Sequence, residues 1–570
     1  MVLVLAWSAF GAPLLLHGQG RGGAEWTTSG HDAQRTAWVR TDARLRKDAV
    51  VKGEFQFLWK AKFDNEPRQL NSLTAPILLD LLIGYRGFKS LAFVGGSDDR
   101  VFAIDTDLAR PYWTAILNYT AATGGRPPSS WECPGGLIAT PTRRTVLAPS
   151  ALAARGGGGR GGRLGSAVGE PGKGAAVLGQ PPPQRAGGPG AAAAPGGRGA
   201  GGRADAGRGG RGPAGIPFGG VDPVFAMGSD GFIHTLLASN GADSEPAVPF
   251  IPPNARPSSL IWVDGVVYTT TSGECGAVPS AVWAMDLTAP EKERKTVSWE
   301  TRAAGIAGSG PALGTDGTVY VAVGKAAATG SRSEYADAIV ALDQRILRPK
   351  DWFSAAGADF NASPIVIRDK DRDLIAATGN DGRLYVLDAA SLGGSDHRTP
   401  FAVSGRYTSS GAGAALATWE EQGTRWILAT AVGPPPTDVT FAANGLAPSG
   451  RVVAFKLVER GTSVALEPAW QSRDLVSPLA PVVVNGLVFA VSSGEYRPAH
   501  AGATLTADER ARRSVPAVLY VLDAASGKTL WTSGTKITSF ARAGLAAGAG
   551  QVYLVTYDNH LYAFGISMEH

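Results

Sequence analysis

Short apolar segments recur along most of the chain, and small-residue turns separate them. Each unit has one apolar strand, a turn, and a second strand that often ends in Asp, with a Trp or Phe soon after. Alternating apolar runs bounded by Gly, Asn, Asp and Ser are typical of β-strands. The pattern therefore predicts an all-β chain built from one repeated unit.

Self-similarity of this kind indicates a repeat fold. A clear copy is LIAATGNDGRLYVLDAASLGG at Leu374. The eight copies begin at Ala92, Val224, Val266, Thr318, Leu374, Ile427, Leu487 and Val552. A further strand, opened by small residues, precedes the copies and starts at Leu73, Leu137, Ser259, Ser309, Ala362, Gly413, Leu479 and Arg542. With the aromatic strand that follows most copies, we expect an eight-bladed β-propeller of four-stranded antiparallel blades.

The last copy ends at Ile566 without a fourth strand, whereas residues 55–63 (FQFLWKAKF) have the pattern of a fourth strand with no strands before them. We expect this segment to complete the eighth blade. The ring would then be closed by pairing the two ends of the chain, which removes exposed strand edges. The predicted organisation is a signal-like segment (1–20), an N-terminal extension (21–54) and one propeller (55–566).

The segment VLDAASGKTLW at Val521 closely resembles the tryptophan-docking repeat of the PQQ-like, quinoprotein alcohol dehydrogenase-like propellers. VLDAASLGG and VFAIDTD are partial copies, and WTTSGHDAQRT at Trp26 adds to the resemblance. The resemblance implies an eight-bladed fold, in which Asp caps a turn, Gly adopts a positive φ and Trp fills the space between blades. The residues with these structural docking roles are Asp105, Trp113, Asp388, Asp523, Gly527 and Trp531.

The family includes PQQ-dependent alcohol and sugar dehydrogenases as well as non-enzymatic members, so the fold alone does not define chemistry. The alcohol dehydrogenases carry a vicinal Cys–Cys disulfide and bind Ca²⁺ through Glu and Asn. This chain has only two cysteines, which are far apart, and no C-x-x-C-H haem motif. PQQ and calcium therefore remain candidate cofactors, although this sequence contains no recognisable motif that binds either one. The catalytic and metal-binding residues are not identified.

The formal net charge of +5 is unevenly distributed. Residues 151–215, which are rich in Gly and Arg, carry a net charge of +7, so the rest of the chain sums to −2. This composition cannot bury a core, and we interpret residues 149–215 as a disordered Gly/Arg/Pro-rich insert in blade two. It contains no aromatic residue for base stacking, and the remaining chain has no basic surplus. We therefore expect no nucleic-acid partner.

Met1 to Gly18 is apolar and indicates a secretory signal, although its start lacks basic residues. No later stretch approaches the roughly 20 apolar residues of a membrane-spanning helix. We expect a periplasmic or secreted bacterial protein that is a monomer. Cys133 and Cys275 fall in loops of adjacent blades on one face, and we hypothesise that they form a disulfide, which an oxidising compartment permits.

Long loops between the second and third strands of blades three, four, six and seven build up that same face. Loops on a rigid scaffold commonly carry binding sites. The candidate ligand- or cofactor-binding residues there are Asn71, Glu274, Ser309, Asn361, Arg497 and His500. Asn and Glu oxygens are suited to Ca²⁺, but they could equally satisfy turn amides. The sequence lacks H-E-x-x-H and G-x-S-x-G motifs.

Two functions follow. The first is a binding platform, for a small-molecule ligand or an envelope protein, without established catalysis. The alternative is a PQQ- and calcium-dependent dehydrogenase that oxidises an alcohol or sugar at the loop-rich face. The recognisable cofactor elements are missing, and this favours the first.

Overall fold

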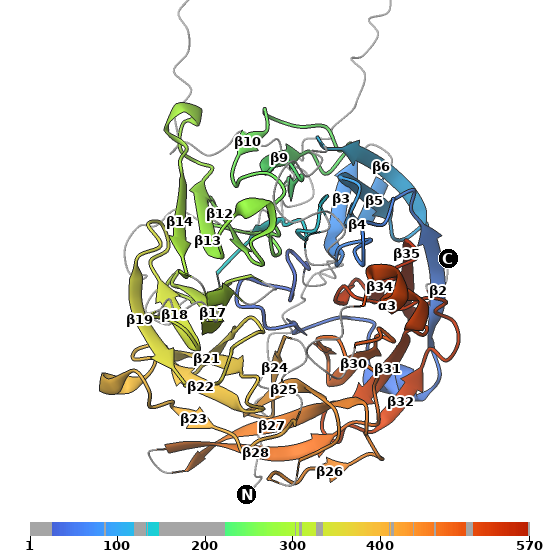
Figure 1. The fold of residues 1–570 in the computed structure, drawn as a ribbon. Helices are drawn as coiled ribbons and strands as arrows, with labels where there is room; N and C mark the ends of the chain where they lie inside the picture. The colour runs from blue at the N-terminus through green and yellow to red at the C-terminus, as the bar shows by residue number, and fades with distance from the viewer. Residues whose placement is uncertain are drawn as a thin grey trace, which may run out of the picture.

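The computed structural model describes residues 25–567, apart from 85–86, 119–132, 134, 148–222, 303, 307–309, 327–333, 410, 412–414, 437, 461–462 and 498–504. Eight separate sheets surround one central axis (Figure 1). The eight-bladed propeller predicted from the repeat is therefore confirmed. The predicted signal-like segment and the Gly/Arg/Pro-rich insert lie outside the described residues.

Within a blade, successive strands are antiparallel neighbours, and the first strand lies nearest the axis. The first strands of blades one and three to eight are β3 (Ile77–Gly84), β11 (Ile261–Val263), β16 (Ala312–Leu313), β20 (Ile365–Asp369), β24 (Ala417–Glu421), β29 (Val482–Val484) and β33 (Ala546–Gly548). The second strands are β4 (Gly87–Gly96), β8 (Val224–Met227), β12 (Val266–Thr271), β17 (Val319–Ala326), β21 (Arg372–Thr378), β25 (Thr424–Val432), β30 (Leu487–Ser492) and β34 (Gln551–Val555).

The outer half of each blade follows the same order. The third strands are β5 (Arg100–Asp105), β9 (Phe232–Leu236), β13 (Ala281–Asp286), β18 (Ala338–Leu342), β22 (Leu384–Asp388), β27 (Gly450–Arg460), β31 (Val518–Asp523) and β35 (His560–Ile566). The fourth strands are β6 (Arg110–Ile116), β10 (Val248–Pro249), β14 (Thr296–Glu300), β19 (Pro349–Ser354), β23 (Ala402–Val403), β28 (Ser463–Gln471), β32 (Thr529–Thr532) and β2 (Phe55–Lys62).

Blade two departs from the four-strand prediction. Its sheet has three strands, and the expected first strand from Leu137 is reduced to one bridge between Thr142 and Phe225. The next residues form β7 (Arg144–Thr145), which pairs in parallel with β11 of blade three. The chain thus leaves blade two early, immediately before the insert predicted from composition.

Apolar side chains on both faces of a strand hold neighbouring blades together. In β22, Leu384 and Val386 join the cluster between blades five and six, whereas Tyr385 and Leu387 join the cluster between blades four and five. A strand between two blades has no solvent face, so both sets of alternating positions are apolar. This packing accounts for the continuous hydrophobic runs of the repeat.

Tryptophans of the fourth strands dock on glycines of the next blade. The Trp113 Nε1 donates to the Ala238 carbonyl at 2.9 Å, and the Trp470 Nε1 donates to the Ala524 carbonyl at 2.8 Å. Gly527 has a φ of 70°, and a Cβ there would overlap the Trp470 ring. Only glycine satisfies both the turn and the close approach.

The two ends of the chain close the ring. Strand β2 pairs antiparallel with β35 along its length, so the N-terminal segment forms the outer strand of blade eight. Phe55 is buried and contacts Phe489 and Trp531 of blade seven, with ring centroids 5.7 and 4.8 Å apart. The predicted closure is confirmed.

Residues 26–42 form a belt inside the ring, which the sequence did not predict. The belt touches every blade in chain order through six of its carbonyls and two of its side chains, with donor–acceptor distances of 2.6–3.0 Å. From blade one to blade eight the contacted residues are Leu78, Arg143, Leu260, Leu313, Val366, Thr418, Val483 and Gly550. Short strand β1 (Trp38–Val39) adds to this contact by pairing in parallel with β29.

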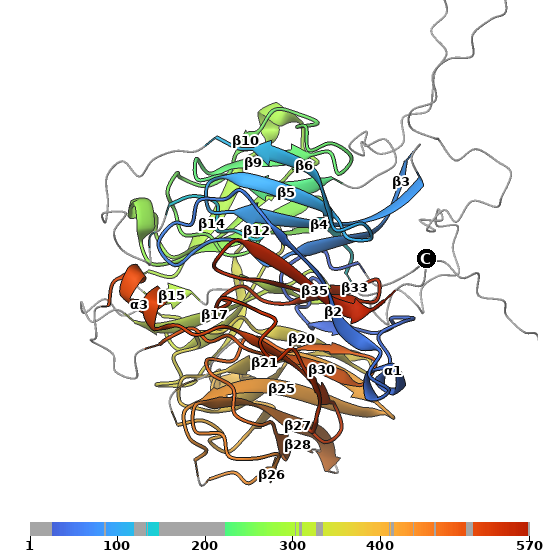
Figure 2. The same cartoon turned by 90° about the vertical axis from the view of Figure 1, so that its right-hand side faces the viewer.

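The helices are short and lie in loops outside the sheets. Figure 2 shows α3 (Ala507–Arg513) on one side of the ring and α1 (Lys47–Val51) on the other. Helix α3 belongs to the long loop between β30 and β31, so it marks the loop-rich face. No helix among the residues that the structure describes is long and apolar enough to cross a membrane.

Candidate functional site

A cavity of about 280 Å³ opens near the axis on the loop-rich face. This volume is close to the lower end of the range for small-molecule sites, about 300 to 1,000 Å³. Its walls come from the loops that enter blades one, two, three and eight and from the 493–517 loop of blade seven. Its polar lining residues are Ser29, Asn71, Ser72, Thr74, Thr140, Arg256, Ser258, Ser259, Arg497, Arg542, Thr556 and Tyr557.

The lining of this axial cavity is basic. Arg256, Arg497 and Arg542 contribute to it, and none of the described lining residues is acidic. Hydroxyl groups supply most of the remaining polar surface, and they can both donate and accept hydrogen bonds. This combination is suited to a small polar ligand that carries negative charge.

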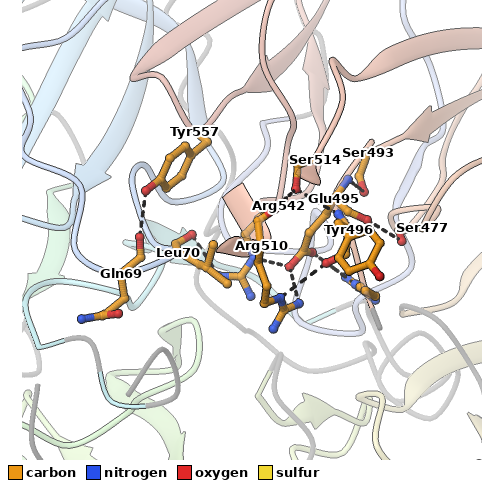
Figure 3. A network of polar contacts seen from close by, with 11 residues as sticks. Gln69, Leu70, Ser477, Ser493, Glu495, Tyr496, Arg510, Ser514, Arg542 and Tyr557 are labelled. Carbon is orange, nitrogen blue, oxygen red and sulfur yellow. Dashed lines mark hydrogen bonds and ion pairs between the residues drawn. The ribbon is translucent and has the colours of Figure 1, made fainter. Parts of the chain in front are cut away.

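A single buried carboxylate organises the arginines (Figure 3). Glu495 is 1% exposed, and its Oε1 lies 2.9 Å from Arg510 Nη2 and 3.1 Å from Arg542 Nε. Its Oε2 lies 3.1 Å from Arg497 Nη2. One carboxylate therefore faces three guanidinium groups, and these four groups carry a net charge of +2. We call them the Glu495 cluster.

Local structure fixes the Glu495 cluster in place. Helix α3 begins with a capping box in which the Thr506 hydroxyl accepts from the Glu509 amide at 3.2 Å, and the Glu509 carboxylate accepts from the Thr506 amide at 2.9 Å. Arg510 projects from this helix onto Glu495. The Ser477 hydroxyl donates to the Glu495 carbonyl at 2.9 Å, which holds the backbone of the loop. Such caps typically stabilise a helix by about 1 kcal/mol.

Arg542 connects the cluster to blade one. Its Nη1 donates to the Leu70 carbonyl at 2.9 Å, and the Tyr557 hydroxyl donates to the neighbouring Gln69 carbonyl at 2.9 Å (Figure 3). Phe540 stacks on Tyr557 with ring centroids 4.7 Å apart. Arg542 of blade eight therefore contacts both blade one, through Leu70, and blade seven, through Glu495.

Burial lowers the pKa of the Arg542 guanidinium below its usual range. The carboxylate of Glu495 opposes this shift, while the positive charges of Arg497, Arg510 and Arg256 add to it. The four guanidinium groups are thus close enough to repel one another. A bound anion would reduce that repulsion.

A second cavity of about 200 Å³ lies next to the first and shares Ser29, Arg542 and Gly544 with it. Its wall includes Trp26 and Arg35 of the belt. Arg35 is 2% exposed and donates to Ser29, Ser259 and Pro311. Burial lowers the pKa of Arg35 to about 9, against the attraction of Asp32. The belt therefore contributes a buried guanidinium, each nitrogen of which donates a hydrogen bond, beside the axial cavity.

A disulfide joins Cys133, in the loop before blade two, to Cys275, in the β12–β13 loop of blade three. Both residues are buried. A Cβ on nearby Gly273 would lie 3.6 Å from both Arg256 Nη1 and Cys275 Sγ. The disulfide therefore borders the wall from which Arg256 enters the axial cavity.

The residues predicted from sequence do not gather at one point. Asn71 and Arg497 line the axial cavity, whereas Asn361 lines the second cavity and donates to Asn380 at 2.7 Å. Glu274 is exposed on the β12–β13 loop and lines neither cavity. Ser309 and His500 lie outside the described residues.

The donor set does not fit a calcium site. Ca²⁺ prefers six to eight oxygen ligands that include carboxylates, and the described part of the axial cavity offers none. Across the described ranges, no three His, Cys, Asp or Glu side chains come together as a metal site would require. Glu495, the nearest buried carboxylate, is already engaged by three arginines. We therefore derive no calcium-dependent step.

Sequence reasoning missed Glu495, Arg256 and Arg542. They lie in three different loops, and no local motif connects them. The sequence contained only an indirect signal for the two arginines. RAGLAAGAG and SLIWVDG have the pattern of first strands, and Arg542 begins the former while Arg256 lies shortly before the latter. Only the closed ring brings those loop positions to a common axis.

The fold defines the class of protein as an eight-bladed β-propeller, and its solved structural neighbours include quinohemoprotein alcohol dehydrogenases. The quinohemoprotein alcohol dehydrogenase from Comamonas testosteroni matches at a TM-score of 0.53 and 14% identity, over 96% of this chain and 81% of that one. The quinohemoprotein alcohol dehydrogenase ADHIIG from Pseudomonas putida HK5 matches at 0.53 and 11%, with the same coverage. At these identities the likeness shows the fold alone, and at that level it confirms the resemblance predicted from the repeat.

BamB from Moraxella catarrhalis aligns with a TM-score of 0.31 and 12% identity, over 90% of this chain and 99% of that one. A score this low supports no conclusion about this chain. No family model matches the sequence, and no curated protein matches it.

Proposed function

We propose that this chain is a ligand-binding propeller whose site is the axial cavity. The observation that carries the proposal is that loops from five blades converge on one polar cavity beside the axis. Rigid blades with converging loops are a common way of building a binding site. The ligand is a small molecule rather than a protein segment, because a cavity of about 280 Å³ holds few atoms.

We place this function in the periplasm or outside the cell. The Cys133–Cys275 disulfide supports this, since disulfides persist in oxidising compartments. The apolar start of the sequence supports it as well.

PQQ-dependent oxidation of an alcohol or sugar is the second candidate. The fold shared with the quinohemoprotein alcohol dehydrogenases favours it. The absence of carboxylates from the described cavity lining speaks against the calcium-dependent form of this chemistry. A scaffold for an envelope protein on the same face is a third candidate, and it predicts partner capture that depends on Arg497.

A thermal-shift screen with a matched pair of variants tests the proposal. Ala543→Trp places an indole in the axial cavity, whereas Ala442→Trp places one on an exposed edge of blade six. Ligands of the cavity should raise the Tm of the wild type and of Ala442→Trp but not of Ala543→Trp. Equal shifts in all three proteins, or none in any, would reject the proposal.

Reconstitution with PQQ and Ca²⁺ separates the two main candidates. Saturable PQQ binding with dye-linked alcohol oxidation would establish the dehydrogenase as the function of this chain. Absence of both, together with ligand stabilisation in the thermal-shift screen, is the expected result.

A further inference from the structure

We infer that the axial cavity binds a small oxyanion, a carboxylate or a phosphate, and that Glu495 is the positioning residue that holds Arg497 and Arg542 for it. This inference rests on the proposed function and adds the chemical class of the ligand. It also assigns a role to a carboxylate that does not itself line the cavity.

The first step of the argument is the charge of the cavity. Three of its described lining residues are arginines and none is acidic. The guanidinium fork pairs with both oxygens of a carboxylate or phosphate, which gives stronger and more directional bonds than neutral groups give. Several hydroxyls around the arginines already donate within the protein, as Ser72 does to Asn559 and Thr556 does to Asp558, so the guanidinium groups are the main donors to the anion.

The second step is the charge imbalance of the Glu495 cluster. Its three arginines share one carboxylate, and Arg256 adds a further positive charge nearby. The Arg510 side chain is 8% exposed and is not among the described lining residues, whereas the Arg497 side chain is 42% exposed at the cavity wall. Arg497 can therefore contact a ligand while it keeps its bond to Glu495.

The third step is the rigidity of the arrangement. Glu495 contacts Arg497 from its own loop, Arg510 from α3 and Arg542 from the loop before β33. Without this carboxylate the three guanidinium groups would only repel one another, so each arginine is held where it reaches Glu495. Glu495 thus fixes the positions of Arg497 and Arg542 relative to each other, and preorganised donors bind an anion with less ordering cost.

Two opposing effects make Glu495→Gln a decisive variant. If only net charge mattered, removing a negative charge beside the cavity would strengthen anion binding. If Glu495 positions the arginines, the same change weakens binding, because Arg497 and Arg542 lose their common partner. The inference predicts a fall of about threefold or more, which is about 0.7 kcal/mol.

The test is calorimetric titration of the full chain with inorganic phosphate, citrate and uncharged glucose. Wild type should bind at least one of the two anions at one saturable site and should not bind glucose. The two anions separate a phosphate ligand from a carboxylate ligand. Arg497→Met should weaken anion binding about tenfold, as expected for the loss of one charge-assisted bond.

Arg383→Met is the matched control. The Arg383 side chain is 41% exposed, it lies 3.8 Å from Asp381 in the β21–β22 turn, and it lines neither cavity. It should bind anions as the wild type does. An equal loss in Arg383→Met and Arg497→Met would show that the binding is general surface electrostatics and would overturn the inference.

The remaining outcomes are also decisive. Tighter anion binding by Glu495→Gln would disprove the positioning role. A low Tm would show that Glu495→Gln does not fold. In that case, the comparison of Arg497→Met with Arg383→Met still tests whether the axial cavity binds anions. Binding of glucose but neither anion, abolished by Ala543→Trp, would reject the inference while leaving the proposed function intact. Binding of no probe, with no hit in the thermal-shift screen, would reject both.

Discussion

At the residue scale, contacts of single side chains hold the turn of the tryptophan-docking repeat in place. Asp523 illustrates this, since its Oδ1 accepts from the Ser526 amide at 2.8 Å and caps the turn that Gly527 completes. Its Oδ2 contacts Lys47 of α1. Burial acts to raise the pKa of Asp523, but the hydrogen bond and charge of Lys47, together with hydrogen bonds from Ser526, lower it below its usual range. The roles of Asp523 and Gly527 were predictable, because one short motif contains Asp523, Ser526 and Gly527, whereas Lys47 lies outside that motif.

Gly527→Ala should destabilise the protein through two effects. A positive φ costs a non-glycine residue about 1 to 2 kcal/mol, and overlap with the Trp470 ring adds about 1 to 3 kcal/mol. Gly423→Ala is the matched control, with a φ of 76° and no atom within 4 Å of the added methyl group. Urea unfolding should show the larger loss for Gly527→Ala. Equal losses would mean that the tryptophan contact contributes nothing.

Asp99 should make stability depend on pH. Burial raises its pKa to about 6, although the amide and hydroxyl of Ser229 donate to its carboxylate. The folded state therefore binds a proton more tightly than the unfolded chain, and stability falls as pH rises from about 4 through 6. The total effect is roughly 3 kcal/mol.

Asp99→Asn removes this dependence. The stability of the variant relative to wild type should therefore increase between pH 4 and pH 7, as measured by unfolding at several pH values. A difference that stays constant over that range would show that Asp99 keeps an ordinary pKa in the folded protein.

At the element scale, the two N-terminal segments behave differently with respect to prediction. Strand β2 was predictable because FQFLWKAKF has strand periodicity and the eighth blade lacked a fourth strand. The belt was not, because it has no periodicity and its bonds to the blades all join residues that are far apart in sequence. The first strand of blade two was overpredicted for a related reason, since its last residue, Arg144, and the following Thr145 pair instead with β11 of blade three.

Phe55→Ala tests the closing strand. Phe55 is 1% exposed between blades seven and eight, so truncation should cost about 3 to 5 kcal/mol of unfolding free energy. Gln56→Ala, at an exposed position of the same strand, should cost less than about 0.5 kcal/mol. Similar effects of the two variants would indicate that β2 does not seal the ring.

At the scale of the whole molecule, the ring is what creates the site. Five blades supply its wall, and the Glu495 cluster joins blade seven to blades one and eight. Sequence reasoning indicated the face on which the axial cavity opens, through its long loops and its two cysteines. It could not identify the cluster, because loop positions in three dimensions depend on blade geometry that periodicity does not encode.

Loss of the disulfide should weaken the whole fold. Cys133 and Cys275 are 142 residues apart, and cross-linking a segment of that length stabilises a protein by about 4 to 5 kcal/mol in the chain-entropy account. Treatment with a dithiol should lower the Tm of wild type but not of Cys133→Ala/Cys275→Ala, which should already be low. Mass spectrometry that finds both thiols free in the purified protein would contradict this.

The most direct test of the central claim is calorimetric titration of wild type and Ala543→Trp with citrate and inorganic phosphate. The account predicts one saturable site in wild type for at least one of these anions, and no binding once the indole fills the axial cavity. Unchanged binding by Ala543→Trp, or no binding by wild type, would contradict the claim that this cavity is an anion site.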